Sequence, residues 1–520
     1  MSDIPRHGAA GQNQFLFVRC LPAQSDQHSK GDLARLALDM QAAEDSVDPG
    51  PDAEENMFVP AGYTYFGQFV DHDLSFDAVS TFDGSVSPLS QRTPRFDLDC
   101  LYGQGPTDRP DMYDPTGVFL VQGAVLDAES GRRDLLRDSA DLAIIGDKRN
   151  DENSIVSQIH AAFIAFHNEM ARKISATRGL NGKALFKAAR QEVTWTYQKV
   201  LVEDYLKRIV SREVIENFDK LRRPNAKGKS QDENAFKLYV SVNRSGIPLE
   251  FAGAAYRFGH SMVRNGYFLQ DGQSFPIFDG VMDEQSLVGF QKLPVNHVIR
   301  DWRRFFPDSS LESTAAGNTM NPAPGIPAGK GGKNVAPDDA PGAPRLQFAY
   351  RIDTSVSNPL ASLPASVADD PPPSLIVRNL WRGAAFELPS GQEVAASLDI
   401  APDSVKLMVR EQIASSPSKT FQYREIDAIF KASTPLWFYV LAEAQQHVVA
   451  KFGSGKFSED DLLENATETG TQLGPVGGRI VLEVFNGLLD SDPDSYRNHP
   501  DAENWTPIVK SFRVWDILTA

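Results

Sequence analysis

The stretch of sequence that decides the fold of this chain is Gly62-Tyr-Thr-Tyr-Phe-Gly-Gln-Phe-Val-Asp-His-Asp-Leu-Ser-Phe-Asp77. It lies within a helical pattern over residues 58–80, and we expect Pro60 to open that helix because proline suits the first helical turn. Most of the stretch is apolar or small, as in a helix that packs in a core. Its second half places a histidine between two aspartates, and that half is the first candidate for a functional site.

The spacing of these polar residues indicates where each would point. Successive residues of an α-helix project about 100° apart, so Asp71, His72 and Asp73 would face three different directions. Gln68 lies four residues before His72 and would share its face. An imidazole and two carboxylates are expensive to bury in a helix that only packs. The alternative is a solvated helix end with an incidental histidine.

A long helix is predicted from Arg149 onwards. Arg149 and Glu152 are three residues apart at its start, so their side chains would share a face. The alternative is an exposed ion pair of little energetic value. Apolar residues then recur at the three- and four-residue steps of an amphipathic helix: Ile155, Ile159, Ala162, Phe163, Phe166 and Met170.

Another helix is predicted from Leu249 to about Val263. His260 would project beside its apolar face, where a lone histidine is more often a structural residue than a ligand. The apolar face is formed by Phe251, Ala254, Ala255, Phe258 and Met262.

Composition and charge exclude several classes of protein. The 520 residues carry 52 Lys and Arg against 69 Asp and Glu, a formal net charge of −17, which disfavours a general nucleic-acid binder. The hydrophobic content of 41% excludes wholesale disorder. Two cysteines, Cys20 and Cys100, are too few for a disulfide scaffold or a cysteine-based zinc site.

The sequence also bears on compartment. No apolar run reaches the roughly 18 residues of a membrane span. The first residues lack the basic region and the apolar region of a Sec signal. We therefore expect a cytoplasmic protein, or one exported without a Sec signal peptide.

The order of these patterns predicts a mainly α fold, with a single large helical domain over residues 56–520 and little β structure. Residues 1–55 are polar and broken by Gly and Pro, and would form an N-terminal arm. Residues 307–346 are rich in Pro, Gly, Ala and Asp and would form a surface insertion. Residues 435–489 return to a helical pattern. Within it a tight turn is expected at Gly470, Gly474, Gly477 and Gly478.

The run Gln68-x-x-Asp71-His72-Asp73 resembles the distal haem segment of the animal-type haem peroxidases, the peroxidase–cyclooxygenase superfamily, and in particular of its bacterial members. The resemblance implies that the large helical domain is a haem-peroxidase domain. It also implies that His72 lies above the haem iron and handles the proton of the peroxide, while Gln68 lines the same cavity. Asp71 would be able to form an ester with the haem, and Asp73 would help to ligate calcium.

The run Arg149-Asn-Asp-Glu152-Asn153 is similar to the Arg-x-x-Glu segment of the same family. The resemblance implies that Arg149 stabilises the negative charge that develops during the reaction, and that Glu152 is a second candidate for a haem ester. Asn153 stands where the most oxidising members carry a methionine that forms a third bond, so we expect at most two links. His167, further along the same helix, matches a structural histidine of the family and is not expected to bind iron.

The run Tyr256-Arg-Phe-Gly-His260-Ser is similar to the proximal helix of the family, which implies that His260 binds the haem iron. Gly259 would let the haem approach the backbone closely. A proximal imidazole needs an acceptor for its other nitrogen, and Asn379 in Arg378-Asn-Leu-Trp-Arg382 matches the asparagine of the family. Downstream, Ala384-Ala-Phe-Glu387 departs from the Arg-Asp-His-Gly of many members.

Calcium takes six to eight oxygen ligands, so Asp73 alone does not suffice. Thr93, Arg95 (through its carbonyl), Asp97 and Asp99 alternate ahead of a Tyr-Gly pair and would converge if the loop is extended. The loop resembles the calcium loop of the family. The alternative is an acidic surface loop.

Arg257 distinguishes two classes of enzyme on this scaffold. The cyclooxygenases carry a radical tyrosine three residues before the proximal histidine, whereas this chain has Arg257 there, as the true peroxidases do, and we expect it beside the haem. The nearest tyrosine, Tyr256, would point about 100° away. The α-dioxygenases place their tyrosine elsewhere, which leaves Tyr350 and Tyr439 open. A fatty-acid dioxygenase is therefore an alternative function.

Taken as a whole, the resemblance implies a haem-dependent peroxidase that uses haem b, with covalent links left open, and Ca²⁺. Its partners would be hydrogen peroxide and a small reducing substrate, either an organic donor such as a phenol or a halide or pseudohalide, and it would serve the response to oxidative stress. A haem-binding protein that has lost catalysis is a further alternative. The joint presence of His72, Arg149 and Gln68 argues against that alternative.

Overall fold

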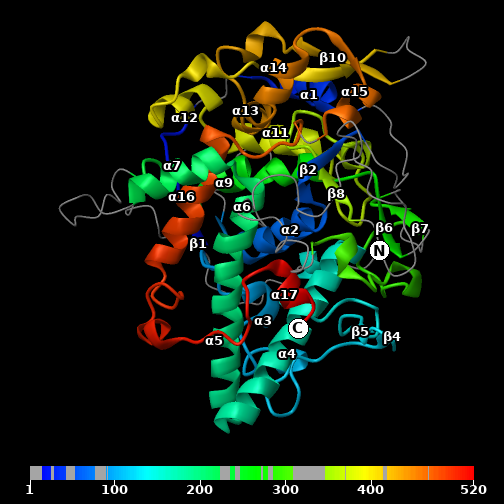
Figure 1. Ribbon diagram of the computed structural model, residues 1–520, viewed down its shortest axis with the longest axis vertical. Coiled ribbons are helices and arrows are strands. Elements are labelled where there is room, and N and C mark those ends of the chain that lie inside the picture. The colour runs from blue at the N-terminus through cyan, green and yellow to red at the C-terminus, as the bar shows by residue number, and fades with distance from the viewer. Residues whose placement is uncertain are drawn as a thin grey trace, which may run out of the picture.

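Two long antiparallel helices, α4 (Ser154–Arg178) and α5 (Gly182–Val200), form the spine of the molecule (Figure 1). Helix α4 begins where the Asn153 side chain accepts hydrogen bonds from the first free backbone amides, those of residues 155 and 156. It ends at Gly179, whose φ of +67° reverses the chain. The prediction of a long helix after Arg149 is confirmed, with a 3₁₀ turn, η2 (Lys148–Asp151), in front of it.

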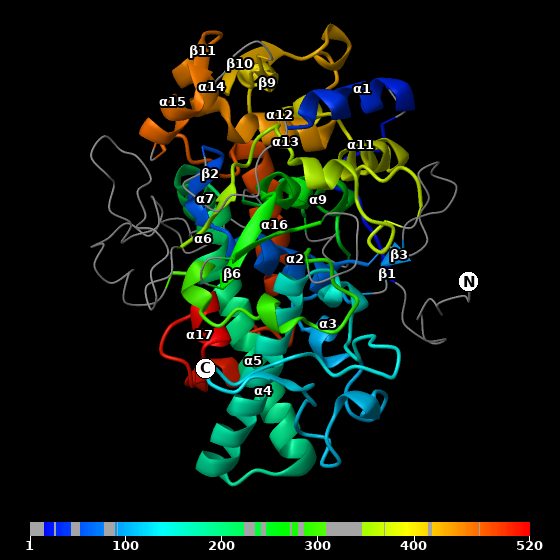
Figure 2. The ribbon, with the colours of Figure 1, turned by 90° about the vertical axis from the view of Figure 1, so that its right-hand side faces the viewer.

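Helix α2 (Gly62–Leu74) lies at the centre of the molecule, next to α4 (Figures 1 and 2). It follows strand β2 (Glu55–Pro60). The prediction that Pro60 opens the helix is wrong: Pro60 is the last residue of the strand and pairs with Phe348 of β8 (Phe348–Tyr350). The helix starts two residues later, where Gly62 packs so tightly that an added Cβ would lie 2.4 Å from the Phe306 ring.

The proximal segment is not the continuous α-helix that the sequence predicts. Helix α9 (Leu249–Gly253) ends early, and Ala254 has φ −141° and ψ −71°, outside the helical region. A 3₁₀ helix, η5 (Ala255–Met262), follows. With three residues per turn, side chains three apart eclipse each other, so Arg257 and His260 share one edge of η5.

Strands are few and short among the described residues, and they pair in antiparallel ribbons: β1–β3, β2–β8, β4–β5, β6–β7 and the three-stranded β11–β10–β9. The molecule is therefore mainly helical with little β structure, as predicted. The remaining strands are β1 (Phe15–Leu16), β3 (Leu89–Ser90), β4 (Val125–Asp127), β5 (Arg132–Arg133), β6 (Gly266–Gln270), β7 (Gln273–Pro276), β9 (Met408–Gln412), β10 (Thr420–Glu425) and β11 (Lys456–Ser458).

The remaining helices surround this spine. The α-helices are α1 (Lys30–Met40), α3 (Asp99–Tyr102), α6 (Leu206–Ile209), α7 (Arg212–Arg222), α11 (Leu375–Ala385), α12 (Gly391–Ser397), α13 (Leu436–Ala444), α14 (Gln446–Phe452), α15 (Glu459–Glu464), α16 (Pro475–Ser491) and α17 (Val514–Leu518). A π-helical turn, η3 (Leu201–Tyr205), extends α5. Short 3₁₀ turns are η1 (Pro110–Met112), η6 (Val295–His297), η7 (Trp302–Arg304), η8 (Asn358–Ala361), η9 (Pro402–Ser404), η10 (Ala428–Phe430) and η11 (Pro500–Asn504).

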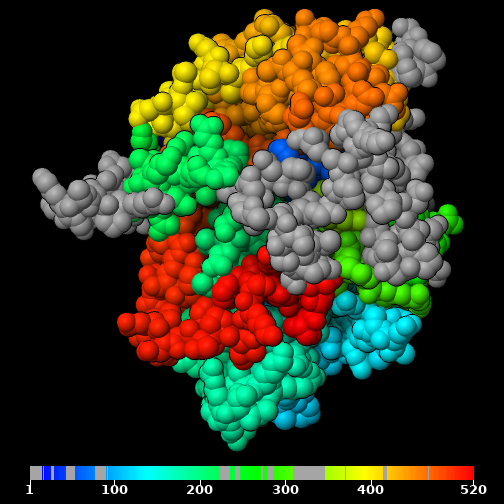
Figure 3. Space-filling model, in the orientation of Figure 1, coloured from blue at the N-terminus to red at the C-terminus, as the bar shows by residue number. Residues whose placement is uncertain are grey.

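One continuous hydrophobic core joins segments that lie far apart in the sequence, from Leu33 to Leu518. Helix α1 packs on α11 at the end of the molecule that also carries β9, β10 and α12–α15 (Figure 2). The C-terminal segment crosses the face of the spine (Figure 3), where Trp505 donates a hydrogen bond to Glu192 of α5 at 2.8 Å. The division into an arm of residues 1–55 and a domain of residues 56–520 stays a prediction.

The computed structural model describes residues 15–24, 28–42, 53–76, 89–90, 92–222, 235–240, 246–270, 273–278, 285–307, 346–368, 370–413, 419–466 and 468–520. Nearly all of the predicted insertion, residues 307–346, falls outside this range. Within it, no helix has the length and apolar character needed to cross a bilayer.

The sequence predicts a tight turn at the four glycines near the C-terminus, but not all of them mark a turn. Gly474 caps α16, but Gly477 and Gly478 lie inside the helix. A Cβ on Gly477 would lie 2.6 Å from Val440, and one on Gly478 would lie 2.8 Å from Val210. These glycines are needed because neighbouring side chains press against the helix backbone.

Candidate active site

One face of the central helix α2 keeps accessible surface although the rest of the helix is buried. Gln68 and Asp71, three residues apart, are its only half-buried side chains, and His72 beside them retains 5% exposure. Asp73 points away from this face and is fully buried. The helix therefore distributes the polar residues in different directions, as the sequence predicts, and leaves accessible surface on Gln68, Asp71 and His72.

The His72 ring is held by a residue that sequence reasoning missed. Its Nδ1 lies 2.9 Å from the side-chain oxygen of Asn150 in η2. Since an amide oxygen only accepts, Nδ1 carries the proton and Nε2 keeps its lone pair. Burial and the nearby Arg149 charge lower the pKa of His72 to about 4. At neutral pH the ring is therefore a neutral base.

Arg149 lies at the edge of the same space, held mainly by a carboxylate that the sequence did not point to. Its Nη2 donates to Asp147 at 2.8 Å, and the same nitrogen reaches the carbonyls of His72 at 3.2 Å and Ser75 at 2.7 Å. Arg92 donates to the same Asp147 carboxylate at 2.9 Å. These two guanidinium groups hold the pKa of Asp147 well below its usual range. The alternative of an exposed Arg149–Glu152 ion pair is wrong, because the partner of Arg149 is Asp147.

Glu152 and Gln68 meet this face from the start of α4. Asn153 donates to the side-chain oxygen of Gln68 at 3.0 Å while it caps the helix. Glu152 is half-buried, and burial raises its pKa to about 7. The charges of Asp71, Arg149 and Arg257 all act on Glu152. The structure therefore brings the two predicted ester carboxylates, Asp71 and Glu152, to one region.

On the proximal side, the Asn379 amide of α11 lies 2.7 Å from Nδ1 of His260. Burial, followed by the neighbouring Arg257 charge, lowers the pKa of His260 to about 3, so the ring is neutral. Arg257 turns its Nε to the carbonyl of Ala252 at 2.8 Å, and its own carbonyl accepts from Trp437 at 3.1 Å. Asn379 and His260 lie together as predicted, but the amide nitrogen Nδ2, and not the expected acceptor oxygen, faces Nδ1.

The space beside η5 fits a flat group. A Cβ added to Gly259 would meet no atom within 4 Å, and both Gly259 and His260 keep accessible surface. The charge of Asp71 on α2 acts on both His260 and Glu152, so the two halves of the site face each other within electrostatic range. A neutral imidazole next to open space ligates haem iron through Nε2 when Nδ1 carries the proton, which here requires the Asn379 amide to turn its oxygen to the ring.

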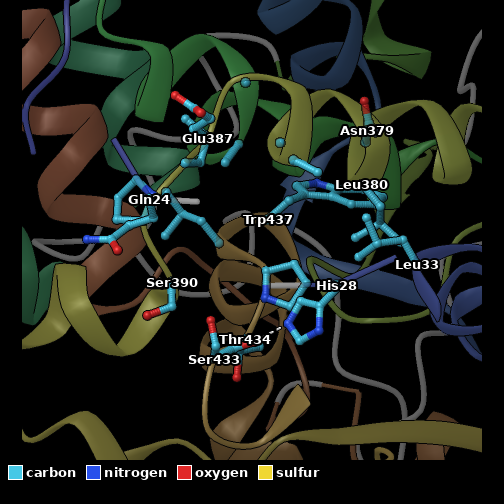
Figure 4. Close-up of a pocket in the computed structure, with 18 residues that line it drawn as sticks. Gln24, His28, Leu33, Asn379, Leu380, Glu387, Ser390, Ser433, Thr434 and Trp437 are labelled. Atoms are coloured by element: carbon cyan, nitrogen blue, oxygen red, sulfur yellow. Dashed lines mark hydrogen bonds between the residues drawn. The ribbon is translucent and has the colours of Figure 1, made fainter. Parts of the chain in front are cut away.

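A separate cavity of about 60 Å³ lies on the other side of Asn379 (Figure 4). It is lined by Asn379 and Leu380 of α11, by Trp437 of α13 and by His28, whose Nε2 lies 2.6 Å from the carbonyl of Ser433. Neither His72 nor His260 lines it. It is therefore not the space between the two histidines.

Three of the predicted calcium residues converge. Carboxylate oxygens of Asp73, Asp97 and Asp99 lie within 4.8 Å of one another, a group able to hold a metal ion. Burial raises the pKa of all three, that of Asp99 to about 7. Thr93 donates to Asp97 at 2.8 Å, whereas the Arg95 side chain turns outward to Asp492 and Asp494.

The sequence analysis assumed an extended loop around these acids, but the loop is not extended. Leu98 has φ +57°, and Asp99 begins the short helix α3. The backbone N–H of Asp99 donates to Asp97 at 3.3 Å. The acids converge because the loop turns back on itself.

Other candidate residues are engaged elsewhere. His167 accepts a hydrogen bond from Tyr102 at Nδ1, 3.0 Å, and donates from Nε2 to the carbonyl of Val118 at 2.9 Å. With both nitrogens occupied it has no lone pair for iron. The Tyr256 hydroxyl donates to Tyr205 at 2.9 Å.

Comparisons with known proteins agree with this geometry. Residues 87–302 match the family model described as animal haem peroxidase. The matched range includes Arg149 and His260 but begins after the α2 motif. The chain is 32% identical to heme peroxidase 2 of Caenorhabditis elegans over 188 residues. These aligned residues make up 35% of this chain and 25% of that protein. Over 178 residues it is 25% identical to the dual oxidase of Drosophila melanogaster, 34% of this chain and 10% of that protein.

The chain thus spans about a quarter of one curated relative and a tenth of the other. Among solved structures, peroxidase A from Dictyostelium discoideum superimposes with a TM-score of 0.56 at 14% identity, over 94% of this chain and 90% of that one. This likeness shows the fold and confirms the predicted fold class. The particular likeness to bacterial members stays a prediction.

Proposed function

We propose that this chain, which belongs to the animal haem peroxidase family, is a haem-dependent peroxidase. It would reduce hydrogen peroxide and oxidise small organic donors, halides or pseudohalides, and so serve the response to oxidative stress. One observation carries the proposal. The Asp71 charge acts on two neutral rings, that of His72, whose Nε2 is free, and that of His260, which keeps accessible surface beside Gly259.

Haem b, when bound, would supply the site for peroxide and the store of oxidising equivalents. His260 would hold the iron through Nε2. For this the Asn379 amide would have to turn, because its Nδ2 faces His260 Nδ1 in the structure, and only its oxygen would accept the Nδ1 proton and fix that tautomer. Gly259 would leave the backbone open to close approach of the cofactor.

On the distal side, His72 would take a proton from peroxide at Nε2 and return it to the departing oxygen, acting as base and then as acid. The Asn150 bond keeps Nε2 free for that transfer. Arg149, fixed by Asp147, would place a permanent positive charge near the developing negative charge. Gln68, held by Asn153, would complete the polar wall.

Asp71 and Glu152 are the candidates for covalent haem esters, since both face the space between α2 and η5. A raised pKa keeps Glu152 partly protonated near neutral pH. We expect haem mass on the denatured protein after peroxide turnover, measured by mass spectrometry. Haem that remains fully extractable in acidic solvent after turnover would contradict the proposal of esters.

We also propose that Asp73, Asp97 and Asp99 bind Ca²⁺, with Thr93 and the Arg95 carbonyl as further ligands. One buried and two half-buried carboxylates within 4.8 Å repel one another, and a divalent cation relieves that repulsion. Because Asp73 immediately follows His72, an ion there would also anchor the distal helix.

A peroxidase is favoured over a fatty-acid dioxygenase by the edge of η5 that carries His260. Arg257 occupies that edge, and the phenol of Tyr256 is tied to Tyr205 instead. A guanidinium is always charged and disfavours an apolar acyl chain beside the cofactor. The hydroxyl of Tyr439, another tyrosine that the sequence left open, donates to the carbonyl of Pro402 at 3.4 Å.

The test is an absorbance spectrum of the haem-loaded protein before and after peroxide is added, followed by oxidation of a phenol. We expect a peroxide-dependent spectral change that the phenol reverses, and about a 10²–10⁴-fold lower rate in H72L. A flat response in protein with full haem content would indicate a haem-binding protein without catalysis. Sustained oxygen uptake with a fatty acid, lost in a Tyr→Phe variant, would establish the dioxygenase instead.

A further inference from the structure

The distal histidine is the first member of a buried hydrogen-bonded chain that reaches a second histidine. His72 Nδ1 lies 2.9 Å from Oδ1 of Asn150, and Nδ2 of Asn150 lies 3.0 Å from Nδ1 of His160. Asn150 and His160 are fully buried, and His72 is 5% exposed. The three side chains come from α2, η2 and α4, so only the folded chain brings them together.

His160 makes no other polar contact in the described part of the chain. Its Nε2 is buried without a hydrogen-bond partner, and its ring packs edge-on against Phe69 with centroids 6.0 Å apart. Burial lowers its pKa to about 3, so the ring is neutral and offers one donor and one acceptor. The Asn150 amide is therefore its single polar link to the site.

An amide between two neutral imidazoles has two consistent arrangements. In the first, its NH₂ donates to His160 Nδ1 and its oxygen accepts the Nδ1 proton of His72, which leaves a lone pair on His72 Nε2. In the second, the NH₂ of the amide donates to His72 Nδ1 and its oxygen accepts the Nδ1 proton of His160. His72 Nε2 then carries a proton. Only the first arrangement allows His72 to act as a base toward the cavity, and it is the one that the structure contains.

We propose that Asn150 and His160 are positioning residues, which hold His72 in the tautomer with Nε2 free. His160 acts by accepting at Nδ1, which fixes the orientation of the Asn150 amide. This inference rests on the proposed peroxidase function and adds two residues to it. Neither residue touches the open space between the two halves of the site, so their effect passes through the His72 ring.

The test compares four variants. N150L removes the chain, and H160L removes only the acceptor that orients the amide. N150D replaces the amide by a carboxylate, which accepts from His72 with either oxygen and needs no orienting partner. In the N150D background, H160L should therefore have little effect on the His72 tautomer. H167L is the matched control, because His167 is also buried on α4 but bonds to Tyr102 and Val118.

The first measurement is the ring ¹⁵N chemical shifts of His72 in ¹⁵N-histidine-labelled protein, in the ferrous carbon monoxide form and without haem, assigned with H72Q. We expect a protonated Nδ1 in the wild type, N150D, N150D/H160L and H167L, and a shift toward protonated Nε2 in N150L and H160L. This readout does not depend on turnover. It would not change if Asn150 and His160 only filled space.

The second measurement is the rate constant of the peroxide-induced absorbance change. N150L and H160L should lower it by about 10–100-fold, whereas adding H160L to N150D should change it by about threefold or less. An unchanged His72 tautomer in N150L, or an equal effect of H160L in both backgrounds, would overturn the proposal. A wild-type protein that does not react with peroxide would refute the proposed function instead. The nitrogen shifts would still show whether Asn150 and His160 set the His72 tautomer.

Discussion

The two sides of the candidate site are built differently. The distal side is a regular helix, α2, whose site residues are tied by side-chain hydrogen bonds to Asn150, Arg149 and Asn153. The proximal side is a 3₁₀ segment, η5, where one bond from Asn379 holds His260 and open space lies beside Gly259.

This difference predicts which property each side of the site controls. The distal side is preorganised by bonds within the chain, as the proposed proton transfer requires. The proximal side offers one ligand and room, so a bound cofactor would supply most of the contacts that complete it. Changes on the proximal side should therefore act on cofactor binding, and changes on the distal side on reactivity or stability.

The largest effect is expected from the two histidines themselves. H260A should lose stoichiometric haem, because the proposed iron ligand His260 lies beside the open backbone at Gly259 with Asn379 behind its ring. H72L should keep haem, since we propose His72 as the base that moves the peroxide proton and not as the iron ligand. Haem content per chain, measured by absorbance after gel filtration, checks both. An H260A protein with a normal five-coordinate ferric spectrum in the absence of imidazole would refute the assignment of the proximal ligand.

The buried histidine of α4 gives a second comparison, this time of stability. Burial lowers the pKa of His167 from 6.5 to about 4, so its neutral form stabilises the fold at and above pH 6.5. That contribution is lost as the pH falls from 6.5 toward 4. The stability difference between wild type and H167Q should shrink by about 3 kcal/mol over this range. Urea unfolding of the haem-free chain at several pH values measures it, and a difference independent of pH would contradict the role.

Calcium should stabilise the distal side specifically. At a concentration about 100 times its dissociation constant, Ca²⁺ should add about 2.7 kcal/mol to the free energy of unfolding. D97N should abolish most of that gain, because it removes one of three converging carboxylates. D494N, an exposed acid on the outward side of Arg95, is the control and should respond as the wild type does. Equal stabilisation of D97N and wild type would place the ion elsewhere.

The smallest effects are expected from substitutions of two glycines, one on each side of the site. A Cβ on Gly67 of α2 would lie 2.4 Å from the Tyr205 hydroxyl, so G67A should destabilise the chain by about 1–3 kcal/mol. A Cβ on Gly259 would meet nothing within 4 Å, so G259A should change stability by less than about 1 kcal/mol. It should instead weaken haem binding. Urea unfolding and haem titration separate the two results; wild-type haem affinity in G259A would show that haem does not occupy that space.

Local sequence patterns predicted the elements whose periodicity is uninterrupted. The helix after Arg149 and the three directions of Asp71, His72 and Asp73 follow from helical geometry alone. The same reasoning failed between Leu249 and Val263, because Ala254 leaves the helical region and the chain continues as a 3₁₀ helix. It also failed at Gly477 and Gly478, where side chains from other helices require a missing Cβ.

The partners of the site residues were out of reach of such patterns. Asn150 and Asp147 stand next to Arg149 in sequence, but nothing in their spacing indicates that they hold His72 and Arg149. Asp147 gains its role because Arg92, far back along the chain, approaches the same carboxylate.

By itself, the sequence nominated the candidate residues: His72, Arg149 and His260 stand in runs that resemble those of the animal-type haem peroxidases. Tertiary structure alone decided the state of those groups. The His72 tautomer depends on Asn150, the position of Arg149 on Asp147, and the orientation of His260 on Asn379. The physical reason is that a protonation state is set by hydrogen bonds and burial. Both arise from contacts between helices that are distant in the chain and adjacent only once it has folded.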